Sequence, residues 1–502
     1  MKKNRQIESY LKNEISIEDL ILLFDKNNFN KEEIKKDGIV YTPMYISDYI
    51  VNILKPQLNE TIFEPAVGHG MFIFSLLNYI EKEFKLKGTQ LKKYFISNVF
   101  FQDLQQQNIE ELKMILIAYF KKKEISLNQN EIKNFFIGNT LSNSKTFDII
   151  FGNPPYVNIR VMEDNTVDFL RKNFNSCKKG NIDLYYAFIE YAYLNSNRSS
   201  FITPNSWLYN TSSEKLRDLV KTDTKLIIDF KHEKIFKEAD TYTSIFLFDK
   251  TFKTSNKDIF YSENLKDFKN IDKSNLDNKR WSFYQDNYKL SIDNKNINFH
   301  TPIATLRDKI FIDSNLDNSD TIPFYKISKI KSSQEFLNSS KSIIFPYKFD
   351  SRTQKYIIRD IKELNPDTIN YLDNNKEELN KRDKGKVEKY DSWFAYGRKQ
   401  GLNTYEENTF LIIIPGMISQ AFKFFSIDSN LIKKPFLFSS GFILEIKNKK
   451  DTELILKYLN SSKFLTFLKN NGKVWQGKNK ESSYFSLSMR QLKNIFSWIT
   501  KS

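Results

Sequence analysis

Asn153, Pro154, Pro155 and Tyr156 are the residues whose types and spacing point most directly to chemistry. They follow the strand-like run "DIIFG" at 148–152. Each proline fixes φ and removes a backbone donor, and the residue before a proline is held out of the helical region. The four residues are therefore predicted to form a stiff, extended hook at the end of a strand. An ordinary strand-ending turn is the alternative.

Such a hook suits a reaction at an exocyclic aromatic amine, for example N6 of adenine. That nitrogen is a poor nucleophile because its lone pair is delocalised into the ring. The Asn153 side-chain oxygen and the Pro154 carbonyl could accept hydrogen bonds from the amine and favour a more tetrahedral nitrogen, while Tyr156 could stack on the base. A rigid backbone would hold both acceptors in place before the reaction, as preorganised catalysis requires.

A second group of residues indicates a nucleoside-containing cofactor. The segment "FEPAVGHGMFIFSLL" (63–77) reads as a strand, a loop with Gly68 and Gly70, and a helix. Glycines allow tight turning and close approach of a ligand. Asp103 ends the next strand, where an acid can accept from two ribose hydroxyls. A plain strand-to-helix turn and a helix N-cap are the respective alternatives. No GxxxxGK[ST] segment is present, which argues against a P-loop site.

Alternating strands and helices must position these residues. Apolar strand patterns alternate with helical patterns such as 106–120 and 183–196, which predicts an α/β fold with a mainly parallel sheet covered on both faces. Ligands of such folds lie at the carboxyl ends of the strands. The predicted strands are "ETIFEP" (60–65), "FISNVFFQD" (95–103), "NFFIGN" (134–139), "FDIIFGN" (147–153), "SSFITP" (199–204), "TKLIIDF" (224–230) and "YTSIFLF" (242–248).

Composition narrows the class of protein. The 502 residues allow two or three domains, and the net charge of +16 favours a polyanionic partner, although a lysine-rich bias would give the same number. Cys177 is the single cysteine, which excludes an internal disulfide and fits a cytoplasmic protein. We find no signal peptide and no apolar run long enough to span a membrane. His69, His232 and His300 lack metal-ligand spacing, so we expect no metal.

Together these segments resemble the gamma class of S-adenosylmethionine-dependent DNA adenine-N6 methyltransferases, the TaqI-like type of restriction-modification systems. The resemblance covers about 38–250, and the order of its motifs is that of the gamma class. The matching segments are "GIVYTPMYISDYIV" (38–51), "FEPAVGHGMF" (63–72), "FFQDLQQQNI" (100–109), "FFIGNTL" (135–141), "FDIIFGNPPYV" (147–157), "GNIDLYYAFIEYA" (180–192), "FITPNSWLYN" (201–210) and "IFKEADTYTSIFLF" (235–248).

The resemblance implies a Rossmann-like methyltransferase domain and a role for each matched residue. Thr42 and Glu64 would hold the methionine part of S-adenosylmethionine, and Asp103 its ribose. Phe236 would pack on the flipped base opposite Tyr156. The remaining implied cofactor residues are Ala66, Gly68, Gly70 and Asn139, where the family usually has Asp in place of Asn139.

The resemblance continues more faintly past residue 300, in "KYDSWFAYGRKQGL" (389–402) and "ILKYLNSSKF" (455–464). It implies DNA contacts from Trp393, Arg398 and Lys399, although buried aromatics beside solvated charges would give the same pattern. The sequence thus predicts a helical lead-in at 1–37, a catalytic domain at 38–252 and a mixed α+β target-recognition domain at 253–502.

The function implied is methylation of adenine N6 at specific sites in double-stranded DNA, within a type II restriction-modification system. A separately encoded endonuclease is the expected partner, because the lead-in is short and carries no recognisable nuclease motif; a monomer is expected. A methyltransferase acting on RNA or protein glutamine is one alternative. A catalytically inactive DNA-specificity module is another.

Overall fold

The computed structural model divides the chain into two compact units, Met1–Phe283 and Tyr284–Ser502. It describes residues 2–28, 41–231, 233–236, 241–251, 257–278, 292–385, 390–398, 400–471, 473–476 and 483–487, and the single positions 281, 283, 290, 388, 489, 492, 493 and 496. None of the helices in these ranges is long and apolar enough to cross a bilayer.

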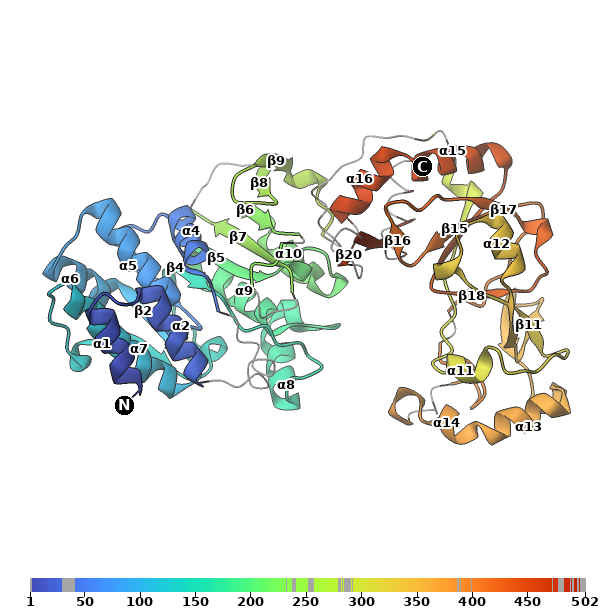
Figure 1. The fold of residues 1–502 in the computed structure, drawn as a ribbon, viewed down its shortest axis with the longest axis horizontal. Coiled ribbons are helices and arrows are strands. Elements are labelled where there is room, and N and C mark those ends of the chain that lie inside the picture. Colours follow the sequence, from blue (N-terminus) through green and yellow to red (C-terminus); the bar gives the residue numbers. More distant parts are fainter. Residues whose placement is uncertain are drawn as a thin grey trace. The chain divides into compact units, whose positions relative to one another are not determined.

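The first unit is built on a nine-stranded sheet with the order β3-β2-β1-β4-β5-β7-β6-β8-β9 (Figure 1). Its strands are β1 (Ile62–Glu64), β2 (Val99–Asp103), β3 (Phe135–Ile137), β4 (Phe147–Gly152), β5 (Ser196–Pro204), β6 (Thr224–Asp229), β7 (Thr243–Asp249), β8 (Asp258–Ser262) and β9 (Lys269–Asp272). Strands β1 to β5 pair in parallel, and β7 runs antiparallel to both β5 and β6. The α/β class and the mainly parallel sheet agree with the sequence prediction, and each of the seven predicted strands is present. The predicted strand at 95–103 begins only at Val99, because residues 95–98 belong to helix α6 (Thr89–Asn98).

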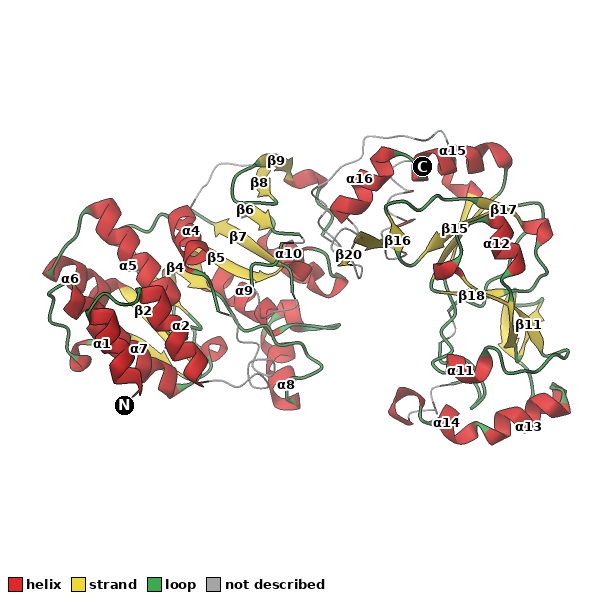
Figure 2. Cartoon of the chain, in the orientation of Figure 1, coloured by secondary structure: helices red, strands yellow, loops and turns green. Residues whose placement is uncertain are grey.

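Helices cover both faces of this sheet (Figure 2). They are α1 (Lys2–Leu11), α2 (Ile17–Asn28), α4 (Met44–Leu54), α5 (Met71–Phe84), α6 (Thr89–Asn98), α7 (Gln106–Lys122), α8 (Asp164–Asn173), α9 (Leu184–Asn195) and α10 (Glu214–Val220). Successive strand residues point to opposite faces, so Ile149 belongs to the core formed with α1, α2, α4, α5, α6 and α7, whereas Ile150 belongs to the core formed with α8, α9 and α10. Two apolar cores result, as expected for strands buried on both sides.

The first unit extends beyond residue 252, where the sequence placed the end of the catalytic domain. Strand β8 pairs in parallel with β6, and β9 pairs with β8, so both belong to the large sheet. Trp281 and Phe283 lie in the core beneath α9 and α10. The boundary therefore follows Phe283, and the predicted lead-in is part of the same unit.

The second unit combines small sheets and short helices, in agreement with a mixed α+β composition. Its sheets have the orders β10-β19-β15-β17, β12-β11-β18, β13-β14 and β16-β21-β20. The strands are β10 (Ile297–His300), β11 (Thr321–Lys326), β12 (Lys341–Ile344), β13 (Tyr347–Asp350), β14 (Lys355–Ile358), β15 (Phe410–Pro415), β16 (Ile418–Ser419), β17 (Ser426–Asp428), β18 (Leu437–Ser439), β19 (Gly441–Ile446), β20 (Lys473–Gln476) and β21 (Ser483–Ser486). The helices are α11 (Asp308–Phe311), α12 (Ser333–Asn338), α13 (Pro366–Asn374), α14 (Lys376–Asn380), α15 (Lys449–Leu459) and α16 (Ser462–Asn471).

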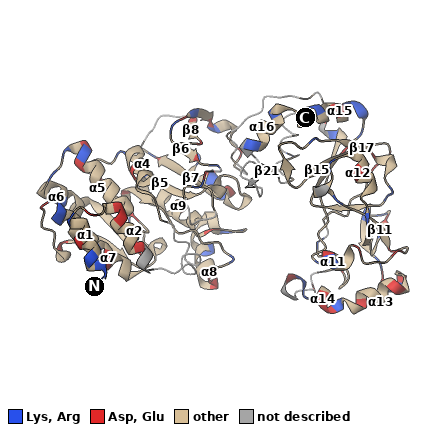
Figure 3. Cartoon of the chain, viewed as in Figure 1, with Lys and Arg blue, Asp and Glu red and all other residues tan. Residues whose placement is uncertain are grey.

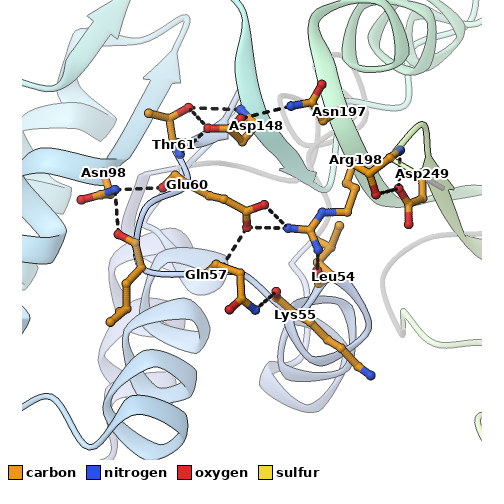
Figure 4. Close-up of polar contacts among 12 residues, drawn as sticks. Leu54, Lys55, Gln57, Glu60, Thr61, Asn98, Asp148, Asn197, Arg198 and Asp249 are labelled. Atoms are coloured by element: carbon orange, nitrogen blue, oxygen red, sulfur yellow. Dashed lines mark hydrogen bonds and ion pairs between the residues drawn. The ribbon is translucent and has the colours of Figure 1, made fainter. Parts of the chain in front are cut away.

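A polar network ties together the amino-terminal ends of β1, β4 and β5 (Figure 4). The Asp148 carboxylate accepts from the Thr61 backbone N–H at 2.9 Å and from Asn197 Nδ2 at 3.1 Å. The Arg198 guanidinium donates to the Leu54 carbonyl at 2.6 Å and binds the Glu60 carboxylate through Nη2. These contacts fix the strands at the end away from Glu64, Asp103 and Asn153, which lie at or just past the carboxyl ends.

We expect Arg198→Ala to lower the free energy of unfolding of the first unit by about 1–3 kcal/mol, because Glu60 and the Leu54 carbonyl both lose their donor. The two side chains are 14% and 21% exposed, so solvent screens the pair only partly. Chemical denaturation would measure the change. Lys93→Ala removes the same charge at an exposed position and should shift stability by less than about 0.5 kcal/mol. Equal effects of the two substitutions would contradict a stabilising role for the network.

Candidate active site

A cavity of about 520 Å³ lies at the carboxyl ends of β1, β2 and β4. Such a volume suits a small organic ligand. Eight of the residues proposed for catalysis or cofactor binding line the cavity, namely Thr42, Glu64, Ala66, Gly68, Asp103, Asn139, Asn153 and Pro154. Parallel neighbouring strands bring these segments together although they are up to 112 residues apart in sequence.

Glu64 ends β1 and is only 2% exposed. Its Oε2 atom is buried and has no hydrogen-bond partner among the described residues. Burial, and secondarily the charge of Asp103, raise the pKa of the Glu64 carboxyl well above its ordinary value. An orphaned acceptor on a cavity wall is costly unless a ligand supplies its donor, so this position fits a cationic or donor group.

Asp103 ends β2, and its carboxylate connects the loop after β1 with the loop after β2. Its Oδ2 accepts from the Gly68 N–H at 2.9 Å, while Oδ1 accepts from the Gln105 N–H at 2.9 Å and Asn108 Nδ2 at 3.0 Å. Burial raises the pKa of the carboxyl, against these hydrogen bonds, which favour the charged form. Helix α7 begins at Gln106, and its N-cap residue is Gln105. Asp103 is therefore not the N-cap of α7.

The two glycines of the β1–α5 loop have different roles. Gly68 has φ = 51°, lines the cavity and leaves open space where a Cβ would stand. Gly70 has φ = 86° and does not line the cavity. A Cβ on Gly70 would lie 2.5 Å from Leu112 Cδ1, so this glycine is needed for packing of α5 against α7.

The Asn-Pro-Pro-Tyr hook follows β4 as expected. Asn153 Nδ2 donates to Thr42 Oγ1 at 3.0 Å, which joins the hook to the segment that opens α4. Asn139 lines the same cavity, and its side-chain oxygen accepts from the Leu141 N–H at 3.0 Å in a short 3₁₀ turn. The Asn139 oxygen therefore has a local structural use in this chain.

Tyr156 and Phe236 come together beside the cavity rather than lining it. Their rings meet edge to face, with centroids 6.3 Å apart and an interplanar angle of 64°. The Tyr156 hydroxyl donates to the Ile202 carbonyl at 3.2 Å, and Phe236 is buried. The predicted neighbours are thus in contact, but the rings touch each other and leave no parallel slot between them.

Several cavity residues were not predicted. Asp25 comes from α2, and Leu104, Gln105 and Asn108 follow Asp103. Leu104 is 72% exposed, which is unusual for a large aliphatic side chain and provides an apolar surface at the cavity. Its place directly after the strand-ending acid was the available signal. Within the described ranges, no group of three or more His, Cys, Asp or Glu side chains could hold a metal ion.

The proposed DNA-contact residues lie in the second unit, where the structure describes Trp393 and Arg398. Lys399 lies outside the described residues. Arg398 is about half exposed and donates to Asp383 at 2.6 and 3.0 Å. Trp393 is partly buried against the core that contains Phe394 and Tyr396. Phe394 and Tyr396 are therefore core residues, whereas Trp393 is partly exposed and Arg398 faces solvent.

The chain is similar in sequence to known restriction-modification proteins. Residues 15–236 match the Eco57I restriction-modification methylase family. The type II methyltransferase M.BanIII of Aneurinibacillus aneurinilyticus is 27% identical over 224 residues, which are 41% of this chain and 37% of that protein. The type II restriction enzyme and methyltransferase RM.Eco57I of Escherichia coli is 25% identical over 360 residues, 59% of this chain and 34% of that protein. The matched regions thus span about a third of the length of these relatives.

Among solved structures, the type IIL restriction-modification enzyme MmeI in complex with DNA is similar, with a TM-score of 0.53 and 15% sequence identity. The likeness covers 96% of this chain and 68% of MmeI. At this identity it concerns the fold alone, and it extends through both units. Residues 15–236, which include the cavity-lining residues and the Asn-Pro-Pro-Tyr hook, therefore carry the sequence pattern of the Eco57I restriction-modification methylase family, on an α/β sheet whose fold resembles that of MmeI.

Proposed function

We propose that this chain is a site-specific DNA methyltransferase that transfers a methyl group from S-adenosylmethionine to N6 of an adenine turned out of the duplex. We place it in a type II restriction-modification system. The observation that carries the proposal is that Asn153 and Pro154 line the same cavity as Glu64 and Asp103. A reacting amine and a cofactor could therefore meet in one enclosed site.

The cavity fits S-adenosylmethionine, which supplies an electrophilic methyl group on its sulfonium. The unpartnered Glu64 Oε2 suits the cofactor's ammonium group, and Asp103 keeps acceptor capacity on Oδ2 for a ribose hydroxyl. Leu104 and Leu141 offer apolar surface for the adenine ring. The backbone at Ala66 and Gly68 allows close approach of the cofactor.

The hook would act on the second substrate. The Asn153 side-chain oxygen and the Pro154 carbonyl would accept the two hydrogens of the amine and raise the reactivity of its lone pair. The nitrogen would then form a bond to the methyl carbon while the bond from sulfur breaks and S-adenosylhomocysteine leaves with the electron pair. The methylated nitrogen would release one proton to solvent. Since N6 cannot reach a buried sulfonium inside the duplex, the base must first be flipped out.

Double-stranded DNA is the substrate that the remaining observations favour. MmeI, whose fold this chain shares, was solved in complex with DNA. The net charge of +16 is favourable for phosphate contacts. Basic and acidic residues occur in both units (Figure 3), so charge alone does not locate the DNA-binding surface. We assign recognition of the DNA site to the second unit. A separately encoded endonuclease is the expected partner of the chain in the cell.

Two alternatives are tested by one assay. Radiolabelled S-adenosylmethionine would be offered with duplex DNA, RNA and protein acceptors, and sequencing of DNA from expressing cells would locate the modified base. Transfer to adenine N6 at one sequence supports the proposal. Transfer only to RNA or to protein glutamine would show that the proposed DNA substrate is wrong. Cofactor and DNA binding without turnover would indicate an inactive specificity module.

Asn153→Ala should lower the rate of methyl transfer by about 10²–10³, the usual cost of losing one preorganised polar partner. Cofactor affinity should stay close to that of the unmodified protein. Single-turnover kinetics and calorimetry would measure the two quantities. Tyr156→Phe serves as a control that keeps the ring, and near-normal methylation by Asn153→Ala would refute the assigned mechanism.

Glu64→Gln should weaken S-adenosylmethionine binding by roughly 1.5–3 kcal/mol, the scale of a hydrogen bond to a charged group. The same change should stabilise the free protein at neutral pH. The folded-state pKa of Glu64 is raised, so its ionisation disfavours the folded state once the pH rises above the ordinary value of 4.5. Calorimetry and thermal unfolding would follow both effects. A loss of both affinity and stability would instead make Glu64 a structural residue.

Arg398→Ala should weaken DNA binding about equally for all sequences and reduce the salt dependence by roughly one phosphate contact. Asp383→Asn should act in the opposite direction, because it weakens the ion pair that competes with DNA for Arg398. Binding to matched and singly altered duplexes at several salt concentrations would measure this. A loss of discrimination at one base pair would indicate guanine reading instead. If DNA binding is unchanged in both variants, Arg398 does not contact DNA.

A further inference from the structure

His69 is completely buried between carboxylates from two different helices. Its Nδ1 contacts the Asp25 carboxylate of α2, and its Nε2 lies 2.9 Å from Glu111 Oε2 of α7. The ring of Phe24 packs against it edge to face, with centroids 5.9 Å apart. Helices α1, α2 and α7 lie against one another (Figure 1), and α2 and α7 hold a side chain that belongs to the loop after β1.

The loop backbone explains this placement. Positive φ angles at Gly68 and Gly70 turn the chain on both sides of His69. The Gly68 N–H donates to Asp103, and the Gly70 N–H donates to the Val67 carbonyl at 2.9 Å. The residue between these anchored glycines points away from the loop into the space between α2 and α7. A shift of its ring must displace the backbone that lines the cavity.

The charges around His69 favour its protonated form. Asp25 and Glu111 are two anions, and Lys3 of α1 makes an ion pair with Glu111. Asp103 adds a more distant negative charge from β2, and the Tyr41 hydroxyl donates to the Asp25 carbonyl at 3.3 Å. Both ring nitrogens face carboxylate oxygens, and only imidazolium has a donor at each nitrogen. These contacts raise the pKa of His69 to about 9, although burial alone would lower it.

Asp25 and His69 line the cavity together with Glu64, Gly68 and Asp103. Both ring nitrogens of His69 are engaged by carboxylates, so the side chain is suited to holding the loop rather than to contacting a ligand. Asp25 and Glu111 fix the ring, the ring fixes the loop, and the loop presents its backbone to the cavity.

We infer that helices α1 and α2 are a working part of the cofactor site and that protonated His69 is the positioning residue through which they order the loop. This inference rests on the proposed function. It assigns the first 28 residues a role in S-adenosylmethionine affinity, in place of a lead-in that merely precedes the catalytic domain.

The sign of the pH dependence follows from linkage. The folded-state pKa of His69 lies above the ordinary value of 6.5, so its stabilising contribution is complete below pH 6.5 and is lost as the pH rises through about 9. The ordered loop is lost with it. Cofactor affinity should therefore decrease between pH 7 and 10 by more than the titration of the cofactor itself explains.

The test uses the full chain and the variants His69→Gln and Asp25→Asn. Calorimetry would give the dissociation constant for S-adenosylmethionine from pH 7 to 10, and steady-state kinetics would give KM for the cofactor and kcat. Glu110→Gln is the matched control, because the neighbouring Glu110 side chain on α7 is 41% exposed and pairs with Lys113 rather than with His69. Thermal unfolding would confirm that every protein is folded at the assay temperature.

We expect both variants to bind the cofactor about tenfold more weakly at pH 7.5, a change of about 1.4 kcal/mol. Their KM should rise while kcat at saturation stays within about twofold, and the pH dependence should flatten in His69→Gln, as for loss of a group that acts on binding. An unchanged dissociation constant, or an equal fall of kcat at saturation, would overturn the inference. If the unmodified protein itself fails to bind the cofactor, the proposed function falls first and the inference with it.

Discussion

The arrangement of the site depends on β1, a strand of three residues paired in parallel with β2 on one side and β4 on the other. Parallel pairing brings the carboxyl ends of all three strands to one edge of the sheet. Glu64, Asp103 and Asn153 meet there for that reason. Helices and loops then complete the enclosure, but none of them could bring these three residues together if β1 paired elsewhere.

The same strand carries a buried acid, Glu64, one of whose carboxylate oxygens has no hydrogen-bond partner among the described residues. Burial disfavours the charged form of Glu64. Polar groups of this kind persist in folded proteins when they serve a ligand, since a better-satisfied side chain would be more stable. At the opposite end of the strands, both terminal nitrogens of the Arg198 guanidinium donate hydrogen bonds, one to the Leu54 carbonyl and one to the Glu60 carboxylate, and these contacts hold the sheet in place.

Most of the first unit could be predicted from sequence because its strands are strongly apolar and end in distinctive residues. The seven predicted strands are present, although residues 95–98 of the second one are helical, and eight of the proposed residues line one cavity. Strands β8 and β9 were missed, since they lie in a segment rich in Lys, Asn and Asp where apolar runs are short. Their pairing with β6 is a tertiary effect.

The contacts of His69 could not be predicted for a related reason. Asp25 and Glu111 lie 44 and 42 residues away from His69, and no spacing pattern links an acid on one helix to a loop residue that far along the chain. Leu104 directly follows the strand-ending acid, but this position alone does not separate a cavity leucine from any other exposed leucine. Assigning Phe236 to the neighbourhood of Tyr156 succeeded, whereas their edge-to-face contact depends on details of packing.

That contact has a consequence for selectivity between ligands. An edge-to-face aromatic pair is worth about 0.5–1.5 kcal/mol beyond its buried area, and a base that enters between the rings must first break it. Free adenine or a mononucleotide would have to supply this energy from stacking alone. A nucleotide within a duplex can draw on phosphate contacts along the whole recognition site. If the chain acts on a flipped base as proposed, the Tyr156–Phe236 contact would thus disfavour isolated bases relative to a base delivered by DNA.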